Sequence, residues 1–270
     1  MRGVILAGGS GTRLHPVTLV VSKQLLPVYD RPMIHYSLSV LMEAGVRDIL
    51  VISTPDHLAS YERLLGDGRS LGLRLCYAPQ PEPRGLAEAL LIGREFIGDN
   101  QIALILGDNV FHSPGLRTLL RRERERLKGC TLFGCPVPDP HRYGVAELDS
   151  SGRITSLVEK PERPTSNLAV VGLYLYDNEA VSRAAELKPS DRGELEITDL
   201  NRTFVESGTA RLVTLDRETT WFDTGTHDSL LQASVFIREQ ARRGRPVGRL
   251  EDVARYMGFV RPGGHGRSVG

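Results

Sequence analysis

The chain has 270 residues, of which 40% are hydrophobic and 25% charged, an ordinary globular composition. Its 34 Lys and Arg against 33 Asp and Glu leave a net charge of +1, so we expect no nucleic-acid or membrane-surface partner. Three cysteines without a CxxC pair argue against a disulfide scaffold and a structural zinc site. The sequence has neither a signal-peptide pattern nor an apolar run of roughly 18 residues, which favours a cytoplasmic location.

The first 130 residues alternate short apolar strands with helices. In chain order, strands are predicted at 4–6, 48–54, 73–78 and 102–106, and helices at 33–44, 57–65 and 85–97. Strands that are apolar throughout, rather than at every second residue, are typical of a parallel sheet covered on both faces. We therefore predict an α/β fold with a doubly wound sheet and ligands at the carboxyl ends of its strands.

The second half of the chain has a different pattern. Strand-like runs at 143–149, 154–159 and 168–176 follow one another with few helical residues between them, which predicts a mixed or antiparallel extension of the sheet. The charge-rich segment 121–128 is interpreted as a solvated helix face. Helices are predicted at 178–187, 195–207, 227–242 and 250–259, and residues 261–270 are expected to be frayed.

A glycine loop directly follows the first predicted strand. Gly8, Gly9 and Gly11 would let the backbone approach a phosphate closely, and Arg13 would add a charged donor. The spacing is neither that of a P-loop nor GxGxxG, so a tight turn between strand and helix stays an equal alternative. Lys23, a few residues on, is a second candidate cation or a surface lysine.

Carboxylates stand at the ends of predicted strands. Asp108 follows the strand at 102–106, where a parallel sheet places a metal ligand or catalytic group, although turn-forming aspartates are common there. Asp223, in Trp-Phe-Asp-Thr-Gly, has the same two interpretations. Glu159 and Lys160 place a carboxylate beside a cation at another strand end, and a surface ion pair is the alternative.

Six motifs occur in one order along the chain: GGSGTRL, SKQLLPVYD, LGDN, VEKP, RGELEITD and WFDTGTHDSL. Together they resemble the sugar-nucleotide pyrophosphorylases, and most closely their thymidylyltransferase branch, from residue 1 to about residue 260. The resemblance implies a Rossmann-like, mostly parallel mixed sheet with a sugar-binding β extension and a short helical C-terminal tail. It also implies conversion of dTTP and glucose 1-phosphate to dTDP-glucose and pyrophosphate, the first step of dTDP-deoxysugar synthesis of the rhamnose type.

The resemblance further implies the roles of individual residues. A sugar-phosphate oxygen attacks the α-phosphorus in line, without a covalent intermediate. Asp108 and Asp223 are expected to hold Mg²⁺, and Lys160 to orient the attacking phosphate; with Arg13 and Lys23 they form the predicted catalytic set. The predicted nucleotide-binding residues are Leu6, Gly8, Gly9, Ser10, Gly11, Thr12, Gln24, Gln80, Gly85 and Asp108. The predicted sugar-phosphate residues are Tyr143, Gly144, Glu159, Lys160, Val170, Tyr174 and Arg192.

The nucleotide preference is left open between dTTP and UTP. The resemblance implies that Gln80 and the backbone at Gly85 read the pyrimidine edge, which thymine and uracil share. Only a methyl group and the 2′-OH separate dTTP from UTP, and one methyl is worth only about 1–3 kcal/mol, so some use of UTP is expected. Two broader interpretations also stay open, a promiscuous sugar-1-phosphate nucleotidyltransferase and a non-catalytic sugar-nucleotide-binding subunit. The intact acidic pair argues against the binding subunit.

The resemblance divides the chain into a catalytic domain at 1–226 and a helical segment at 227–270. Within the first, about 1–130 would bind the nucleotide and about 131–226 the sugar. The family pattern changes at Arg84, Glu88, His112 and Ser113, and the C-terminal segment is shorter than in relatives. We expect a homo-oligomer, dimer or tetramer, with intact catalysis and an uncertain regulatory nucleotide site.

Overall fold

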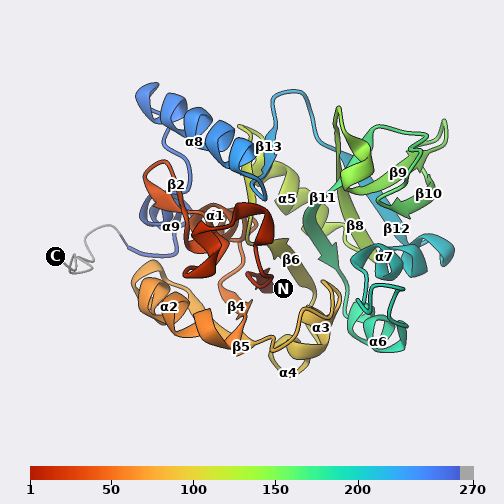
Figure 1. The fold of residues 1–270 in the computed structure, drawn as a ribbon, viewed down its shortest axis with the longest axis horizontal. Helices are drawn as coiled ribbons and strands as arrows, with labels where there is room; N and C mark the ends of the chain where they lie inside the picture. Colours follow the sequence, from red (N-terminus) through yellow and green to blue (C-terminus); the bar gives the residue numbers. More distant parts are fainter. Residues whose placement is uncertain (262–270) are drawn as a thin grey trace.

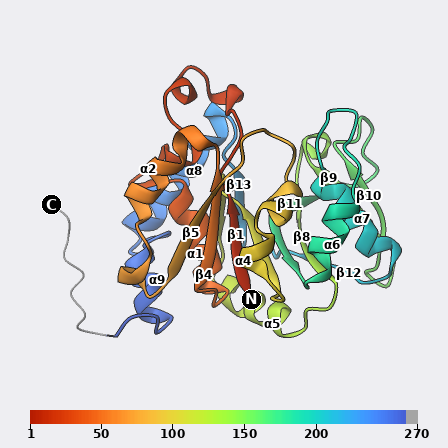
Figure 2. The same ribbon diagram turned by 90° about the horizontal axis from the view of Figure 1, so that it is seen from below.

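One central sheet runs through the protein and carries helices on both faces (Figures 1 and 2). The computed structural model describes residues 1–261. The strands of this sheet are β1 (Arg2–Leu6), β4 (Asp48–Ser53), β5 (Arg74–Pro79), β6 (Ile102–Leu106), β8 (Cys130–Pro136), β9 (Gly144–Leu148), β10 (Ile154–Glu159), β11 (Leu168–Tyr176) and β12 (Ala210–Thr214). Their order is β10–β9–β11–β6–β1–β4–β5, and β8 pairs with both β11 and β12.

Most helices form two layers, one on each face of the sheet, and one long helix packs elsewhere. One face of the sheet is covered by α1 (Ile34–Glu43), α2 (Pro55–Leu65), α5 (Leu116–Glu125) and α9 (Leu250–Tyr256). The other face is covered by α3 (Glu88–Ile92), α4 (Arg94–Ile97), α6 (Glu179–Glu186) and α7 (Ile197–Glu206). The long α8 (His227–Arg242) packs on the small hairpin of β2 (Pro27–Val28) and β3 (Arg31–Pro32) (Figure 1).

Burial on both faces explains the continuous apolar runs in the first half. β1 pairs in parallel with β4 on one side and β6 on the other. Val4 and Leu6 point into the core under α3 and α4, whereas Ile5 points into the core under α1. Since the apolar side chains of the strand alternate between two cores, no polar alternation arises. The predicted doubly wound, mostly parallel sheet is confirmed.

The extension, predicted to be mixed or antiparallel, is mixed: most of its pairs are antiparallel, but β12 pairs in parallel with β8. β11 pairs antiparallel with β6, β8 and β9, and β9 pairs antiparallel with β10. The sequence did not predict β8, β12 or the separate ladder of β7 (Asn109–His112) and β13 (Thr220–Asp223). β7 and β13 have four residues each, too few for a periodic signal.

Two local predictions need correction. The helix predicted at 85–97 is two short helices that meet at Gly93, whose ψ of 2° lies outside the helical range. The segment 121–128 is not wholly a solvated face, since Glu123 is fully buried between Arg122 and Arg211. The frayed end predicted for 261–270 falls, beyond residue 261, outside the described residues. Within the described part, no helix has the length and apolarity to cross a membrane.

Candidate active site

The candidate site lies at the carboxyl ends of β1 and β6, the two central strands of the sheet. These strands are in register from Arg2 and Ile102 to Leu6 and Leu106, so the segments that follow them start at the same level. The glycine loop follows β1, and Asp108 follows β6. The Gly107 N–H donates to the Leu6 carbonyl at 2.9 Å and joins the two segments.

Asp108 is a buried carboxylate held from two sides. Its Oδ2 forms an ion pair with the Lys23 ammonium, and its Oδ1 accepts a hydrogen bond from Asn109 Nδ2 at 3.0 Å. Burial disfavours the ionised form, but the charge and hydrogen bond of Lys23, with the bond from Asn109, outweigh it. They hold the pKa of Asp108 below its usual range, so this carboxylate stays ionised at neutral pH.

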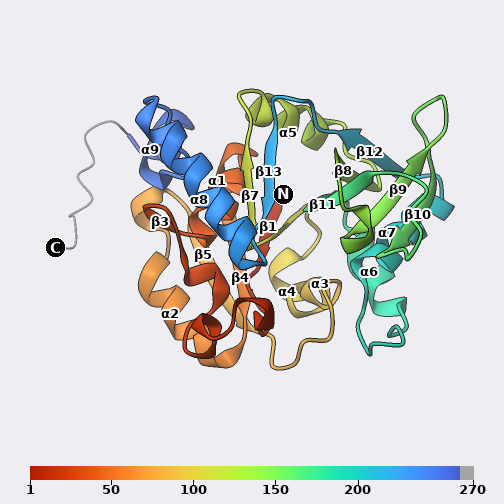
Figure 3. The same ribbon diagram turned by 45° about the horizontal axis from the view of Figure 1, so that its top comes forward.

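A short ladder of β7 and β13 joins two distant parts of the chain beside Asp108 (Figure 3). β13 pairs antiparallel with β7, and the register places Asp223 opposite Asn109. The next residue, Thr224, donates to the Asp108 carbonyl twice, from its N–H at 3.1 Å and its hydroxyl at 2.6 Å. Burial and the neighbouring Asp108 charge raise the pKa of Asp223, the expected effect of two carboxylates sharing one corner.

The two aspartates suit a hard divalent cation. Mg²⁺ is usually held in proteins by one or two carboxylates and completes its shell with waters and substrate phosphates. The described residues contain no group of three or more His, Cys, Asp and Glu side chains that could hold a metal by themselves. Asp108 and Asp223 therefore fit an ion that a phosphate substrate helps to bind.

A cavity of about 200 Å³ opens on one side of Asp108 and takes in most of the predicted nucleotide residues. Its lining combines apolar side chains with a few polar groups, a composition suited to a flat heterocycle. The lining residues are Leu6, Gly8, Gly9, Lys23, Gln24, Gln80, Pro83, Gly85, Leu86, Leu106, Asp108 and Glu194.

A second cavity, of about 220 Å³, opens on the other side of Asp108. At its floor Glu159 accepts from the buried Thr198 hydroxyl at 2.5 Å and lies 3.2 Å from the Lys160 ammonium. Lys160 has a φ of +42°, a strained conformation for a residue with a side chain, and such strain collects at functional sites. The lining residues are Arg13, Leu86, Leu106, Asp108, Asn109, Arg142, Tyr143, Gly144, Glu159, Lys160, Val170, Gly172, Tyr174, Ile197, Thr198, Asn201, Trp221 and Asp223.

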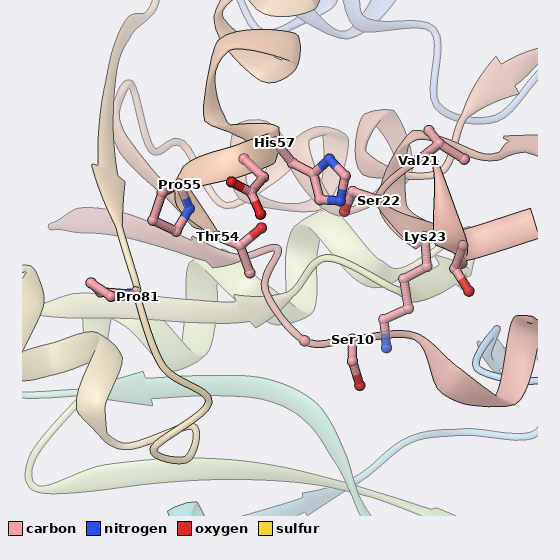
Figure 4. A pocket seen from close by; sticks show the side chains of 11 residues that line it. Ser10, Val21, Ser22, Lys23, Thr54, Pro55, His57 and Pro81 are labelled. Carbon is pink, nitrogen blue, oxygen red and sulfur yellow. The ribbon is translucent and has the colours of Figure 1, made fainter.

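A third hollow, of about 450 Å³, lies between the glycine loop and the start of α2 (Figure 4). Lys23 and Gly9 line both this hollow and the first cavity, so the two spaces share a wall. The side chains of Ser10, Lys23 and His57 surround the hollow in Figure 4. Its lining is mostly polar, and Lys23 gives it a positive charge beside Asp108.

Comparison with known proteins identifies the family of the chain. A family model described as nucleotidyl transferase matches residues 2–240. This chain belongs to the nucleotidyl transferase family. The glucose-1-phosphate thymidylyltransferase of Xanthomonas campestris pv. campestris (strain B100) is 56% identical over 260 residues, 96% of this chain and 88% of that protein. The family expected from the sequence motifs is confirmed.

Solved structures agree with this nucleotidyl transferase fold. A Bacillus anthracis protein described as a glucose-1-phosphate thymidylyltransferase, in complex with a sucrose, matches with a TM-score of 0.83 and 38% identity. The match covers 88% of this chain and 96% of that one. A UDP-glucose pyrophosphorylase complexed with UDP-glucose matches with a TM-score of 0.76 and 27% identity, covering 88% and 98%.

Some of the residues that the sequence predicted to bind the nucleotide do not face the nucleotide cavity. Gln24 lines the nucleotide cavity, but its amide is engaged with the Gly8 carbonyl, Ser22 and Tyr61 and so holds the glycine loop. Ser10 lines only the third hollow, whereas Gly11 and Thr12 line none of the three.

Two predicted arginines lie apart from the nucleotide cavity. Arg13 lines the second cavity and approaches Gly225, where a Cβ would come within 2.6 Å of its guanidinium. The Arg192 guanidinium pairs with Glu196 at 2.8 Å and Glu194 at 3.7 Å and lines none of these cavities. The roles assigned to both stay predictions.

Sequence reasoning missed Asn109 and Trp221. The buried Asn109 Oδ1 accepts from the Gly172 N–H at 3.1 Å and from the Trp221 indole at 2.7 Å, while its amide holds Asp108. The Trp221 ring meets Tyr143 edge-on, with centroids 5.3 Å apart. Both residues were visible in the LGDN and WFDTG motifs, but only their aspartates had a recognisable chemistry.

Proposed function

We propose that this nucleotidyltransferase transfers a thymidylyl group from dTTP to glucose 1-phosphate and releases pyrophosphate. One observation carries the proposal: Asp108 lines both the nucleotide cavity and the second cavity, with Asp223 beside it in the second. Two substrates bound in these cavities would meet at the acidic pair. The names of the similar proteins supply the substrates, because the geometry alone supports only a nucleotide and a second anionic ligand.

The first cavity suits the pyrimidine nucleoside of dTTP. Gln80, 5% exposed, presents a polar group to the cavity, which Leu6 and Leu86 also line. Gly85 has a φ of +100°, and a Cβ there would lie 2.4 Å from the Leu195 carbonyl, so only glycine lets the loop lie this close. The Gly85 loop, which lines the cavity, is thereby held against the segment that leads into α7.

The glycine loop and Lys23 suit the triphosphate. Backbone N–H groups of such a loop can point at phosphate oxygens, and the Lys23 ammonium lies on the wall shared by the nucleotide cavity and the third hollow. We place the outer phosphates along the loop, toward this hollow. Arg13, on the opposite side, would face the charge that develops at the α-phosphorus.

The second cavity suits a sugar phosphate. Glu159 and the Thr198 hydroxyl can bind sugar hydroxyl groups, and the Lys160 ammonium can hold the phosphate and orient its oxygen. Attack of that oxygen on the α-phosphorus breaks its bond to the bridging oxygen, and pyrophosphate leaves with the bonding electrons. Positioning supplies most of the rate, since no covalent intermediate on the protein is needed.

Asp108 and Asp223 would hold a divalent cation such as Mg²⁺. Bound there, it would neutralise charge on the phosphates as they approach each other. Lys23 already contributes a positive charge at Asp108, so the pair of carboxylates is not left without compensation. The product would serve sugar-nucleotide metabolism, as a precursor of dTDP-deoxysugars, and a homo-oligomer stays part of the proposal.

The experiment that tests the proposal is pyrophosphate release from dTTP and glucose 1-phosphate, with Mg²⁺ present. The Asp108→Asn variant should lose about 10²–10³-fold in turnover or more, because it removes charge where the phosphates are held. Asp99→Asn, an exposed carboxylate far from the cavities, is the matched control and should keep full activity. An Asp108→Asn variant as active as the control would overturn the role of Asp108, whereas a parent that releases no pyrophosphate would favour a non-catalytic binding subunit.

A UTP-using enzyme is the second candidate, favoured by the likeness to a UDP-glucose pyrophosphorylase. Thymine and uracil present the same hydrogen-bonding edge to Gln80, so the cavity must separate them by the methyl group or the ribose. Comparing kcat/KM for dTTP and UTP decides between the two. A ratio far above one supports the thymidylyltransferase, and a ratio below one supports the UTP-using enzyme.

A further inference from the structure

The side-chain amide of Gln80 is clamped in one orientation. Its Nε2 donates to Glu88 Oε2 at 2.8 Å and to the Gly85 carbonyl at 3.2 Å. A carboxylate and a carbonyl accept hydrogen bonds and cannot donate them. The NH₂ end of Gln80 must therefore face these two partners, and the carbonyl end must face the other way.

The free end of Gln80 faces the nucleotide cavity. Among the described residues nothing donates to Oε1, and a Cβ on Gly8 would lie 3.0 Å from it. Gly8 lines the same cavity, so its missing side chain leaves the oxygen open to a ligand. What Gln80 offers the cavity is thus a hydrogen-bond acceptor.

The clamp itself is held firmly by the backbone around it. The Leu195 N–H donates to the Arg84 carbonyl at 2.7 Å, and the Ala87 N–H donates to the Leu195 carbonyl at 3.1 Å. These two bonds tie the segment on either side of Gly85 to the segment that leads into α7. Glu88 begins α3 directly after this anchor, so its backbone is fixed within reach of Gln80.

We propose that Glu88 is a positioning residue that sets base specificity by holding Gln80 with its acceptor toward the base. Thymine and uracil carry an N–H at N3, which can donate to Oε1. Cytosine has an unprotonated N3 and would place an acceptor against an acceptor. A glutamine at position 88 could reverse its own amide and let Gln80 turn over, whereas a carboxylate cannot. The inference rests on the proposed function and names how that site chooses its nucleotide.

The test compares two nucleotides that differ only in the base edge, dUTP and dCTP. The ratio of their kcat/KM values is measured for the parent enzyme, for Glu88→Gln and for Glu82→Gln. Glu82 lies in the same loop but is exposed and pairs with Arg84, so its variant is the matched control. We expect the ratio to fall about tenfold in Glu88→Gln and to stay unchanged in Glu82→Gln.

A ratio within one enzyme does not depend on how much of that enzyme is folded. A merely structural role of Glu88 would lower both rates together and leave the ratio at the parent value, which would overturn the inference. In a Gln80→Ala background, Glu88→Gln should change the ratio no further, because the residue through which it acts is gone. A further tenfold change there would also contradict the inference.

A binding measurement separates this inference from the proposed function. Calorimetric Kd values for dUTP and dCTP should show the same loss of preference in Glu88→Gln. If the parent binds dUTP over dCTP but releases no pyrophosphate, the proposed reaction fails while the role of Glu88 is still tested. If the parent binds both equally, Gln80 does not read the base and the inference is wrong.

Discussion

Asn109 shows how one buried side chain organises the acidic corner. It is 2% exposed, and its amide oxygen accepts from both the Gly172 N–H and the Trp221 indole while its NH₂ holds Asp108. These bonds link β7, β11 and β13 and fix one carboxylate oxygen. A buried donor left without a partner costs about 1–3 kcal/mol, so the corner depends on this residue for geometry and stability alike.

We expect Asn109→Ala to lower the free energy of unfolding by about 2–4 kcal/mol, since it leaves two donors unpaired in the interior. Pyrophosphate release should also fall, because the Asp108 carboxylate loses its second anchor. Urea denaturation measures the first effect. The control is Asn167→Ala, an exposed residue whose side chain has no hydrogen-bond partner among the described residues. Equal stability of the two variants would contradict the prediction.

At the scale of elements, α8 begins directly after the acidic corner. Thr226 caps it: its hydroxyl accepts from the Ser229 N–H at 3.2 Å, and the Thr226 N–H donates to the Ser229 hydroxyl at 3.1 Å. This capping box fixes the turn between Asp223 at the end of β13 and the first turn of the helix. The cap therefore helps to fix the position of Asp223 as well as the start of the helix.

Thr226→Ala should destabilise the protein by about 1 kcal/mol, the usual cost of losing a helix cap. Thr226→Ser keeps the hydroxyl and should stay within a few tenths of a kcal/mol of the parent. Thermal unfolding of the two variants, side by side, checks this difference. A serine variant as unstable as the alanine variant would show that the methyl group, rather than the cap, matters.

A second junction of elements involves a titrating group. Glu43 ends α1 near Arg117 of α5, whose guanidinium lies 4.8 Å from the centre of the Tyr256 ring of α9. Burial raises the pKa of Glu43 from 4.5 to about 7, against the opposing pull of Arg117. The folded state thus favours the protonated acid, and its stability falls as the pH rises from about 4.5 through 7.

Glu43→Gln removes this loss of stability. We expect the variant to exceed the parent by about 3 kcal/mol in free energy of unfolding at pH 8, and to match it near pH 4. Denaturation curves at the two pH values measure the difference. Glu95→Gln, an exposed helical glutamate, should give no such pH-dependent gain. A variant less stable than the parent at pH 8 would mean that the pair with Arg117 dominates.

For the whole molecule, the acidic corner is where two parts of one sheet meet. The nucleotide cavity lies over β1 and β6, and the second cavity lies over β9, β10 and β11, with Asp108 on both linings. β11 pairs directly with β6, so the two cavities share one rigid sheet. The phosphates of two substrates would be brought together here by the fold, with like charges that need neutralising.

Removal of divalent cations should therefore stop the reaction. We expect a chelator to abolish pyrophosphate release, because Lys23 and Arg13 cannot by themselves offset the charge of the substrate phosphates and the two aspartates. Added Mg²⁺ should restore it, and an equal ionic strength of NaCl should not. Full turnover in excess chelator would show that the acidic pair does not work through a metal ion.

The sequence predicted the central strands because their side chains are buried on both faces of the sheet, which makes the runs apolar throughout. It predicted most helices because one face of each is buried, which gives a helical period of apolar residues. It missed β7 and β13, which have four residues each, and β8, which contains Gly, Cys and Pro. It also missed β12, of which only Leu212 is buried. It found Asp108 through its position after an apolar strand and Asp223 through the resemblance of its motif. It did not find Asn109, since an asparagine that accepts from two distant donors has no local signature.

The amino-acid sequence by itself determined the alternation of strands and helices, the glycine loop, and which side chains could bind phosphate or metal. These features follow from local periodicity and residue type. Tertiary structure decided which of them meet. Asp223 reaches Asp108 through the pairing of β13 with β7 and the two bonds of Thr224, across more than a hundred residues of chain. Long-range pairing depends on how whole surfaces pack, and no window of sequence contains both partners.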